Sequence, residues 1–117
     1  HQQQDTEESA FLAQAIKLVE QNLHVNGYSV EQLSRDLCME RTGLYRKLVT
    51  MLDQSPSLFI RNIRLQRAAQ LITEGKLSIT EIEEHTGFSS SSYLSKCFQE
   101  MYGCRPSEYA EKAKKST

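Results

Sequence analysis

The chain has 117 residues, of which 38% are hydrophobic and 25% are charged, and it contains only two prolines. This length and composition are typical of one compact folded unit, whose core is either single or divided between two lobes. No apolar run approaches the roughly 18 residues needed to cross a bilayer, and the polar start lacks the apolar core of a signal peptide. We therefore expect a cytoplasmic chain that makes no membrane contact of its own.

Charge is distributed unevenly along the chain, although the formal net charge is only -1. Residues 1–40 carry seven acidic and two basic side chains, whereas residues 41–76 carry seven basic and two acidic ones. A segment this basic is a candidate contact surface for a polyanion. The alternative is an ordinary solvated helix face.

The chain offers few residues for chemistry at a metal or a catalytic centre. Cys38, Cys97 and Cys104 form no Cys-x-x-Cys pair, so neither a disulfide framework nor a zinc site is expected. We interpret Cys38 and Cys97 as small core residues in a reducing compartment. Because no nucleophile elbow, phosphate-binding glycine loop or carboxylate pair occurs, we predict no catalysis, no cofactor, no metal and no small-molecule site.

The first predicted element is a helix. Residues 1–8 are polar and are interpreted as a tail or linker. Apolar side chains then recur at helical spacing, at Leu12, Ala15, Ile16, Val19 and Leu23. Asn26 and Gly27 follow and are expected to end this helix.

Three further helix starts are visible. The segments "SVEQ" at 29–32 and "SITE" at 78–81 are capping boxes, in which the serine caps an early backbone N–H and the Gln or Glu side chain reaches back. Each is expected to open a short helix. Ser55 and Pro56 supply the N-cap and first position of a long helix that ends before Gly75.

The segments that follow the two capping boxes repeat each other. At an offset of 49, Ser29, Val30, Leu33 and Met39 match Ser78, Ile79, Ile82 and Phe88. At an offset of 50, Leu44, Leu48, Pro56 and Phe59 match Leu94, Phe98, Pro106 and Tyr109. Each copy reads as a short capped helix, a tight turn, a second helix and a closing proline, which is a helix-turn-helix in outline. We therefore predict an all-α fold with two helix-turn-helix lobes, 9–54 and 76–117, joined by a linker helix over 55–75.

Three stretches carry a resemblance to a known family: "SVEQLSRDLCMERTGLYRKL", "SPSLFIRNIRLQRAAQLI" and "SITEIEEHTGFSSSSYLSKCFQEMYGCRPSEY". They resemble the DNA-binding domain of the AraC/XylS family of transcription regulators, over about residues 9–112. The most specific part is I-x-x-I-x-x-x-x-G-F-x-x-x-S-Y-x-S-x-x-F followed by G-x-x-P-x-x-Y. The resemblance implies an all-helical domain with two helix-turn-helix lobes that binds specific double-stranded DNA sequences and has no enzymatic activity.

The resemblance also implies a larger context. In the family this domain usually follows a separate sensing or dimerisation domain, and the transcription machinery is a further partner. The "LYRKL" and "SPSLFIRNIRLQRA" segments also resemble output domains of hybrid two-component regulators. The chain is then either a cytoplasmic regulator or the cytoplasmic part of a longer, membrane-linked one.

The second helix of each unit is the expected reader of DNA, because that helix enters the major groove in a helix-turn-helix. Apolar stripes are expected to be buried at Leu44, Leu48, Met51 and Leu52, and at Leu94, Cys97, Phe98 and Met101. The opposite faces then consist of Arg41, Thr42, Tyr45 and Arg46, and of Ser91, Ser92, Ser95, Lys96 and Gln99. The resemblance implies that positions 42, 45 and 46, with 91, 92, 95 and 96, read bases.

Individual roles follow from side-chain chemistry. Arg46 can pair in bidentate fashion with guanine, for about 1–3 kcal/mol of discrimination, or can contact only phosphate. Tyr45 either contacts a thymine methyl or a phosphate, or simply covers its helix. Lys96 is expected at a phosphate. The serines either contact DNA or only cap and solvate a helix start.

Further phosphate contacts are predicted along the chain, at Ser29, Arg61, Arg64, Ser78 and Ser89. Ser89 is interpreted as the N-cap of the second recognition helix. The alternative for Arg64 is an ion pair with an acid between the lobes. A helix over 56–74 is about 28 Å long at 1.5 Å per residue, close to the roughly 34 Å between successive major grooves, so the two recognition helices are expected in successive grooves.

Four residues depart from the family pattern. Glu40 replaces a capping serine, Gly43 weakens the first recognition helix, Glu83 replaces a small alanine, and Arg105 replaces a cap before the second proline. Glu40 matters most for function, because a carboxylate near the groove repels phosphate. The first lobe is therefore expected either to bind weakly or to select a particular base, such as cytosine through its amino group. A helical protein-interaction module without DNA binding is the alternative class.

Overall fold

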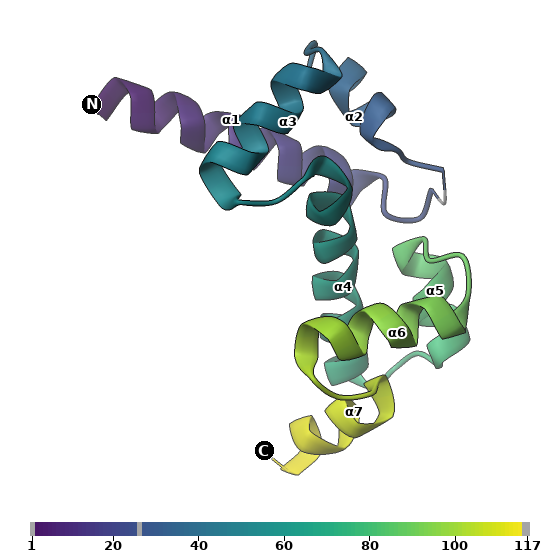
Figure 1. Ribbon diagram of the computed structural model, residues 1–117. Coiled ribbons are helices and arrows are strands. Elements are labelled where there is room, and N and C mark those ends of the chain that lie inside the picture. Colours follow the sequence, from purple (N-terminus) through teal and green to yellow (C-terminus); the bar gives the residue numbers. More distant parts are fainter. Residues whose placement is uncertain (1, 26, 116–117) are drawn as a thin grey trace. The chain divides into compact units, whose positions relative to one another are not determined.

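The computed structural model describes the backbone of residues 2–25 and 27–115 and the side chains of 7–25 and 27–114. Within these residues the chain forms seven α-helices and no strand, which confirms the predicted all-α fold (Figure 1). The helices are α1 (Gln2–Gln21), α2 (Val30–Asp36), α3 (Arg41–Leu52), α4 (Pro56–Glu74), α5 (Ile79–Thr86), α6 (Ser91–Tyr102) and α7 (Pro106–Lys115). None of the described helices combines the length and apolarity that crossing a membrane requires.

The helices form two compact units. The first lobe is His1–Asn22 with Tyr28–Ile60, and the second lobe is Leu23–Gly27 with Arg61–Thr117. Helix α4 contributes residues to both lobes, since the first lobe ends at Ile60 and the second continues from Arg61. The physical reason is burial along its length, since its side chains from Leu65, Ala68, Ala69, Leu71 and Ile72 lie in the core of the second lobe.

Helix α1 is longer at its start and shorter at its end than the sequence indicated. The backbone is helical from Gln2, so residues 2–8, expected as a polar tail, belong to α1. Glutamine and glutamate are good helix formers, which favours this extension. The helix ends at Gln21. His1 and the predicted terminator Asn26 lie outside the described residues.

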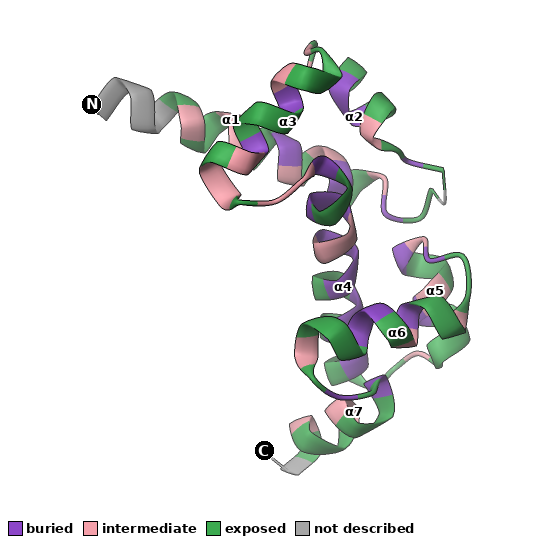
Figure 2. Ribbon diagram, viewed as in Figure 1, coloured by how far each residue is buried: buried purple, intermediate pink, exposed green. Residues whose placement is uncertain are grey.

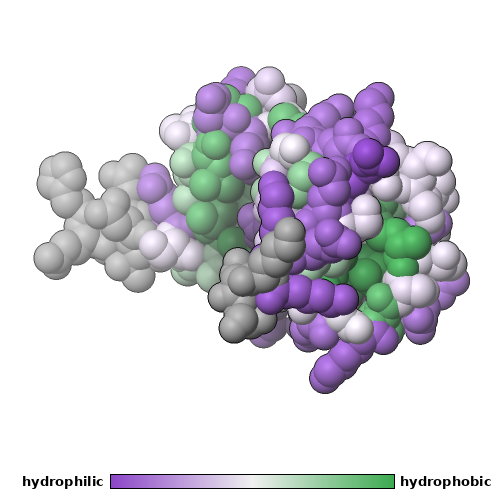
Figure 3. All heavy atoms as spheres, turned by 90° about the horizontal axis from the view of Figure 1, so that it is seen from below, coloured by the Kyte–Doolittle hydropathy of each residue, from purple (hydrophilic) through white to green (hydrophobic). Residues whose placement is uncertain are grey.

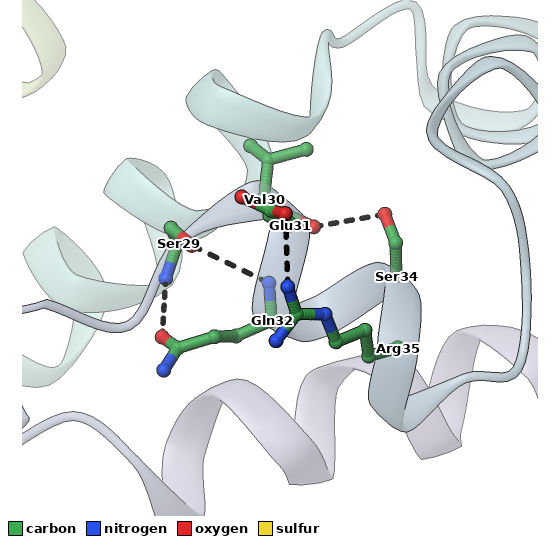
Figure 4. Close-up of polar contacts among 6 residues, drawn as sticks. All are labelled: Ser29, Val30, Glu31, Gln32, Ser34 and Arg35. Carbon is green, nitrogen blue, oxygen red and sulfur yellow. Dashed lines mark hydrogen bonds and ion pairs between the residues drawn. The ribbon is translucent and has the colours of Figure 1, made fainter.

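Both capping boxes are confirmed. The backbone N–H of Gln32 donates to Ser29 Oγ at 3.3 Å, and the Ser29 N–H donates to Gln32 Oε1 at 3.1 Å (Figure 4). At α5 the corresponding distances between Ser78 and Glu81 are 3.2 and 3.0 Å. Hydrogen bonds from the Ser78 backbone and hydroxyl hold the pKa of the Glu81 carboxyl below its usual value.

The sequence repeat is reproduced in the backbone turns. Cys38 (φ 57°) follows α2 and Gly87 (φ 74°) follows α5, while Asp53 (φ 56°) and Gly103 (φ 76°) end α3 and α6. These left-handed positions lie 49 and 50 residues apart, as the repeat requires. Cys38 is exposed, so its interpretation as a core residue is wrong. It stands at the turn position that glycine fills in the second lobe, whereas Cys97 and Cys104 are buried.

Each lobe buries its own apolar side chains (Figure 2). The first lobe encloses, among others, Ala15, Val19, Leu33, Leu44 and Leu48, each fully buried. In the second lobe three aromatic rings pack together. The ring centroid of Phe98 lies 4.6 Å from that of Tyr102 and 5.2 Å from that of Tyr109. On the face shown in Figure 3 hydrophilic atoms predominate, and hydrophobic atoms gather in limited areas.

Candidate nucleic-acid interface

The predicted face of α3 is exposed and lines a surface groove. Arg41, Thr42, Tyr45 and Arg46 are all exposed, with Tyr45 at 53%. Together with side chains from the starts of α2 and α4 they form the wall of an open groove within the first lobe. The buried Leu44 and Leu48 hold the opposite side of the helix in the core, so that packing fixes the orientation of the polar face.

Helix α6 presents the corresponding face in the second lobe. Ser91, Ser92, Ser95 and Lys96 line a shallow groove, which also includes Gln99 and Glu100. Ser92 and Lys96 are exposed, whereas Ser91 and Ser95 are half-buried. The predicted buried stripe is confirmed at Leu94, Cys97 and Phe98. Met101, which we expected in that stripe, is 38% exposed.

The two faces occupy equivalent positions in the repeat but differ in charge, since the α3 face carries two arginines and the α6 face one lysine. Arg41, Thr42, Tyr45 and Arg46 stand 50 positions before Ser91, Ser92, Ser95 and Lys96. Neither Arg46 nor Lys96 forms an ion pair with an acidic side chain in the described part of the chain. Both cations are therefore available to an external anion.

Sequence reasoning missed a contact at the start of α6. Ser91 Oγ donates a hydrogen bond to Glu83 Oε2 on α5 at 2.5 Å. The departure of Glu83 from the family pattern was a signal, but its partner could not be read from the sequence. The N-cap of α6 is Ser90, whose hydroxyl accepts from the Tyr93 N–H at 3.1 Å, and not Ser89 as predicted.

The predicted phosphate contacts divide into three groups. Ser29, Ser78 and Ser89 are exposed at or next to helix starts. Arg61 is half-buried and its Nη1 lies 3.4 Å from Glu100 Oε2. Arg64 is 6% exposed, so the prediction that it contacts phosphate is wrong.

Arg64 serves the interior of the second lobe. Its Nη1 donates to the carbonyl oxygens of Leu23 and Thr86, at 2.6 Å each, and its Nη2 donates to that of Val25 at 3.1 Å. Burial lowers the pKa of its guanidinium. No carboxylate takes part, so the alternative of an ion pair is also wrong for the described residues. The three carbonyls thus accept hydrogen bonds from three of the five N–H donors of the guanidinium.

The start of α3 allows a stability prediction. Glu40 is the N-cap, with an extended backbone (φ -78°, ψ 153°) and no side-chain cap hydrogen bond. Glu40→Ser should stabilise the first lobe by about 1 kcal/mol, because the serine oxygen would accept from an unpaired N–H of the first turn. Ser90→Ala should cost the second lobe a similar amount. Thermal unfolding measures both, and an unchanged melting temperature for Glu40→Ser would contradict the prediction.

The chain is similar in sequence to parts of longer proteins. Histidine kinase P4 of Formosa agariphila is 40% identical over 98 residues, 84% of this chain but 7% of that protein. The virulence regulon transcriptional activator VirF of Yersinia enterocolitica is 33% identical over 92 residues, 79% of this chain and 34% of VirF. The chain thus spans far less than two thirds of these relatives.

The similarity to a solved structure extends over nearly the whole length of both chains. A transcriptional regulator from Chromobacterium violaceum, described among AraC-type DNA-binding domain-containing proteins, matches with a TM-score of 0.83 and 26% identity, over 92% of this chain and 96% of that one. The two repeated lobes with their exposed second helices define a helix-turn-helix protein. A family model described as a helix-turn-helix domain matches residues 33–112. The chain belongs to this family and is of the AraC type.

Proposed function

We propose that this chain binds specific sequences of double-stranded DNA in transcription regulation, with α3 and α6 as recognition helices in successive major grooves. The observation that carries the proposal is the pair of equivalent exposed faces on the second helices of a repeated helix-turn-helix. In such units the second helix places its N-terminal residues at base edges. Both faces carry their polar side chains in that part of the helix.

The chemistry of the two faces suits complementary roles. Arg46 is exposed and without an acidic partner among the described side chains, so its guanidinium is available for a bidentate contact with guanine. The α6 face has hydroxyls with one lysine, which suits close approach to the groove and a phosphate contact from Lys96. Ser29, Ser78, Ser89 and Arg61 are further candidates for phosphate.

The relatives support a place in a longer regulator. Both are much longer than this chain, one is named a histidine kinase and the other a transcriptional activator. We assign this chain the output role in such a protein, with DNA in the cytoplasm as its partner and no catalytic step of its own.

The test is selection of bound duplexes from a random pool by this 117-residue chain at low and physiological salt. Two enriched motifs about one helical turn apart are expected, with affinity that falls steeply as salt rises because bound counterions are released. Arg46→Ala should weaken binding to the selected duplex by about 5- to 150-fold, since a bidentate contact is worth about 1–3 kcal/mol. Lys96→Ala should weaken binding to all duplexes alike.

Lys17→Ala is the matched control, because it removes one positive charge from the exposed surface of α1, outside both faces. It should leave motif selection unchanged. Enrichment of a single motif would mean that only one lobe reads bases. The absence of enrichment and of salt-sensitive binding would overturn the proposal and favour a protein-interaction module.

A further inference from the structure

Glu83 brings a carboxylate against the first turn of the second recognition helix. Its Oε2 accepts the hydrogen bond from Ser91 Oγ at 2.5 Å, and both side chains are half-buried. In the first lobe the equivalent position, 49 residues earlier, is Ser34, which donates to the Val30 carbonyl of its own helix at 2.8 Å (Figure 4). Of the two recognition helices in the described chain, only α6 therefore has a carboxylate at this repeat position.

This contact fixes the direction of the Ser91 hydrogen bond. A serine hydroxyl has one proton to donate and two lone pairs that accept, while an ionised carboxylate only accepts. The 2.5 Å separation lies in the range of charge-assisted O–H···O⁻ hydrogen bonds, which are stronger than neutral ones. The Ser91 proton is thus committed to Glu83, and only the lone pairs of Ser91 remain for another partner.

The neighbouring hydroxyls on this face have no such restriction. Among the described residues neither Ser92 nor Ser95 has a hydrogen-bond partner for its hydroxyl, so each can donate or accept. Ser91 differs from them because of Glu83 and not because of its own chemistry.

The major groove contains groups that such an acceptor can distinguish. Adenine and cytosine present amino donors there, whereas the corresponding groups of guanine and thymine are carbonyl acceptors. We propose that Glu83 holds Ser91 as a hydrogen-bond acceptor and so makes the second lobe select an amino-bearing base, adenine or cytosine, at the position that Ser91 faces. This inference rests on the proposed DNA binding. Glu83 is a positioning residue, since it acts through Ser91.

The test compares Glu83→Ala and Ser91→Ala with the unchanged chain. Each variant is titrated with duplexes that carry all four bases at each position of the motif selected by the second lobe. The unchanged chain should prefer adenine or cytosine at one position by about 3- to 10-fold, the effect of one hydrogen bond. Ser91→Ala should remove this preference by weakening binding to the amino-bearing bases. Glu83→Ala should remove it in the opposite way, by strengthening binding to guanine and thymine, because the freed hydroxyl can donate.

Glu84→Ala is the matched control, since it removes the same charge from the adjacent, exposed position of α5. It should raise affinity for all duplexes alike and leave the base preference intact. Glu83→Gln, which keeps the shape of the side chain, replaces Glu83→Ala if circular dichroism shows that the alanine variant is unfolded. Glu83→Gln should reduce the preference for adenine or cytosine over guanine and thymine, because the glutamine amide can donate to Ser91 as well as accept from it.

Two outcomes would overturn the inference while salt-sensitive, sequence-selective binding persists. In one, the Glu83 variants keep the preference that Ser91→Ala removes, which would mean that the carboxylate only ties α5 to α6. In the other, Ser91→Ala changes no base preference, so that Ser91 reads no base. If the unchanged chain bound no DNA at all, the proposed function itself would be refuted.

Discussion

Replacing Arg64 by methionine is expected to lower the free energy of unfolding of the second lobe by about 3–5 kcal/mol. The guanidinium satisfies the carbonyls of Leu23, Val25 and Thr86, and a buried acceptor left without a donor costs about 1–3 kcal/mol. The total lies in the lower half of the summed range because the hydrogen bond to the Val25 carbonyl is only partly buried. A loss of this size is a large part of the 5–15 kcal/mol typical of a folded domain.

Arg64→Lys tests the geometry of the side chain. Lysine keeps the positive charge but has a single ammonium in place of a planar five-donor fork. We expect it to recover less than half of the lost stability, because one nitrogen cannot occupy both Nη positions.

The measurement is urea unfolding followed by circular dichroism, with amide hydrogen exchange to assign the loss to the second lobe. Arg67→Met is the matched control on the same helix, since Arg67 is exposed and its Nη1 donates a hydrogen bond to the exposed side chain of Gln70, at 2.9 Å from Oε1. It should change the free energy of unfolding by less than about 0.5 kcal/mol. A similarly small effect for Arg64→Met would contradict the role assigned to its hydrogen bonds.

The hydrogen bonds of Arg64 could not be predicted from the sequence. The helices and their capping boxes could be predicted because their signals are local, as at Ser29 with Gln32 or at Ser78 with Glu81. The acceptors of Arg64 lie 41, 39 and 22 residues away in sequence. From sequence, Arg61 and Arg64 were both expected at phosphate, and only the fold shows that Arg64 is buried while Arg61 is half-buried.

The recognition faces were predictable to a similar extent. The repeat and the apolar stripes indicated which side of α3 and α6 is exposed, because burial of Leu44 or Leu94 determines the opposite face. Ser89 and Ser90 could not be ranked as N-caps, since the chemistry of neighbouring serines is the same and only the backbone distinguishes them. The partner of Glu83 depended on how α5 and α6 pack, which no local pattern contains.

Replacing Gly87 by alanine is expected to cost the second lobe more than about 4 kcal/mol or to abolish its folding. Gly87 has a φ of 74°, a left-handed conformation that costs other residues about 1–2 kcal/mol. A Cβ at this position would also overlap Arg64 Nη1 and the backbone oxygen of Leu23. The carbonyl cannot give way without breaking its hydrogen bond to Arg64, so the steric cost adds to the backbone cost.

Gly103→Ala separates these two contributions. Gly103 has nearly the same φ, 76°, and also ends a helix, but a Cβ there would meet nothing within 4 Å. It should therefore lose only the backbone contribution of about 1–2 kcal/mol. The difference between the two alanine variants, measured by thermal and urea unfolding, is the cost of pushing a methyl group between Arg64 and Leu23. Equal losses would mean that the segment around Leu23 can move aside, and that the hydrogen bond from Arg64 to Leu23 contributes little to the stability of the lobe.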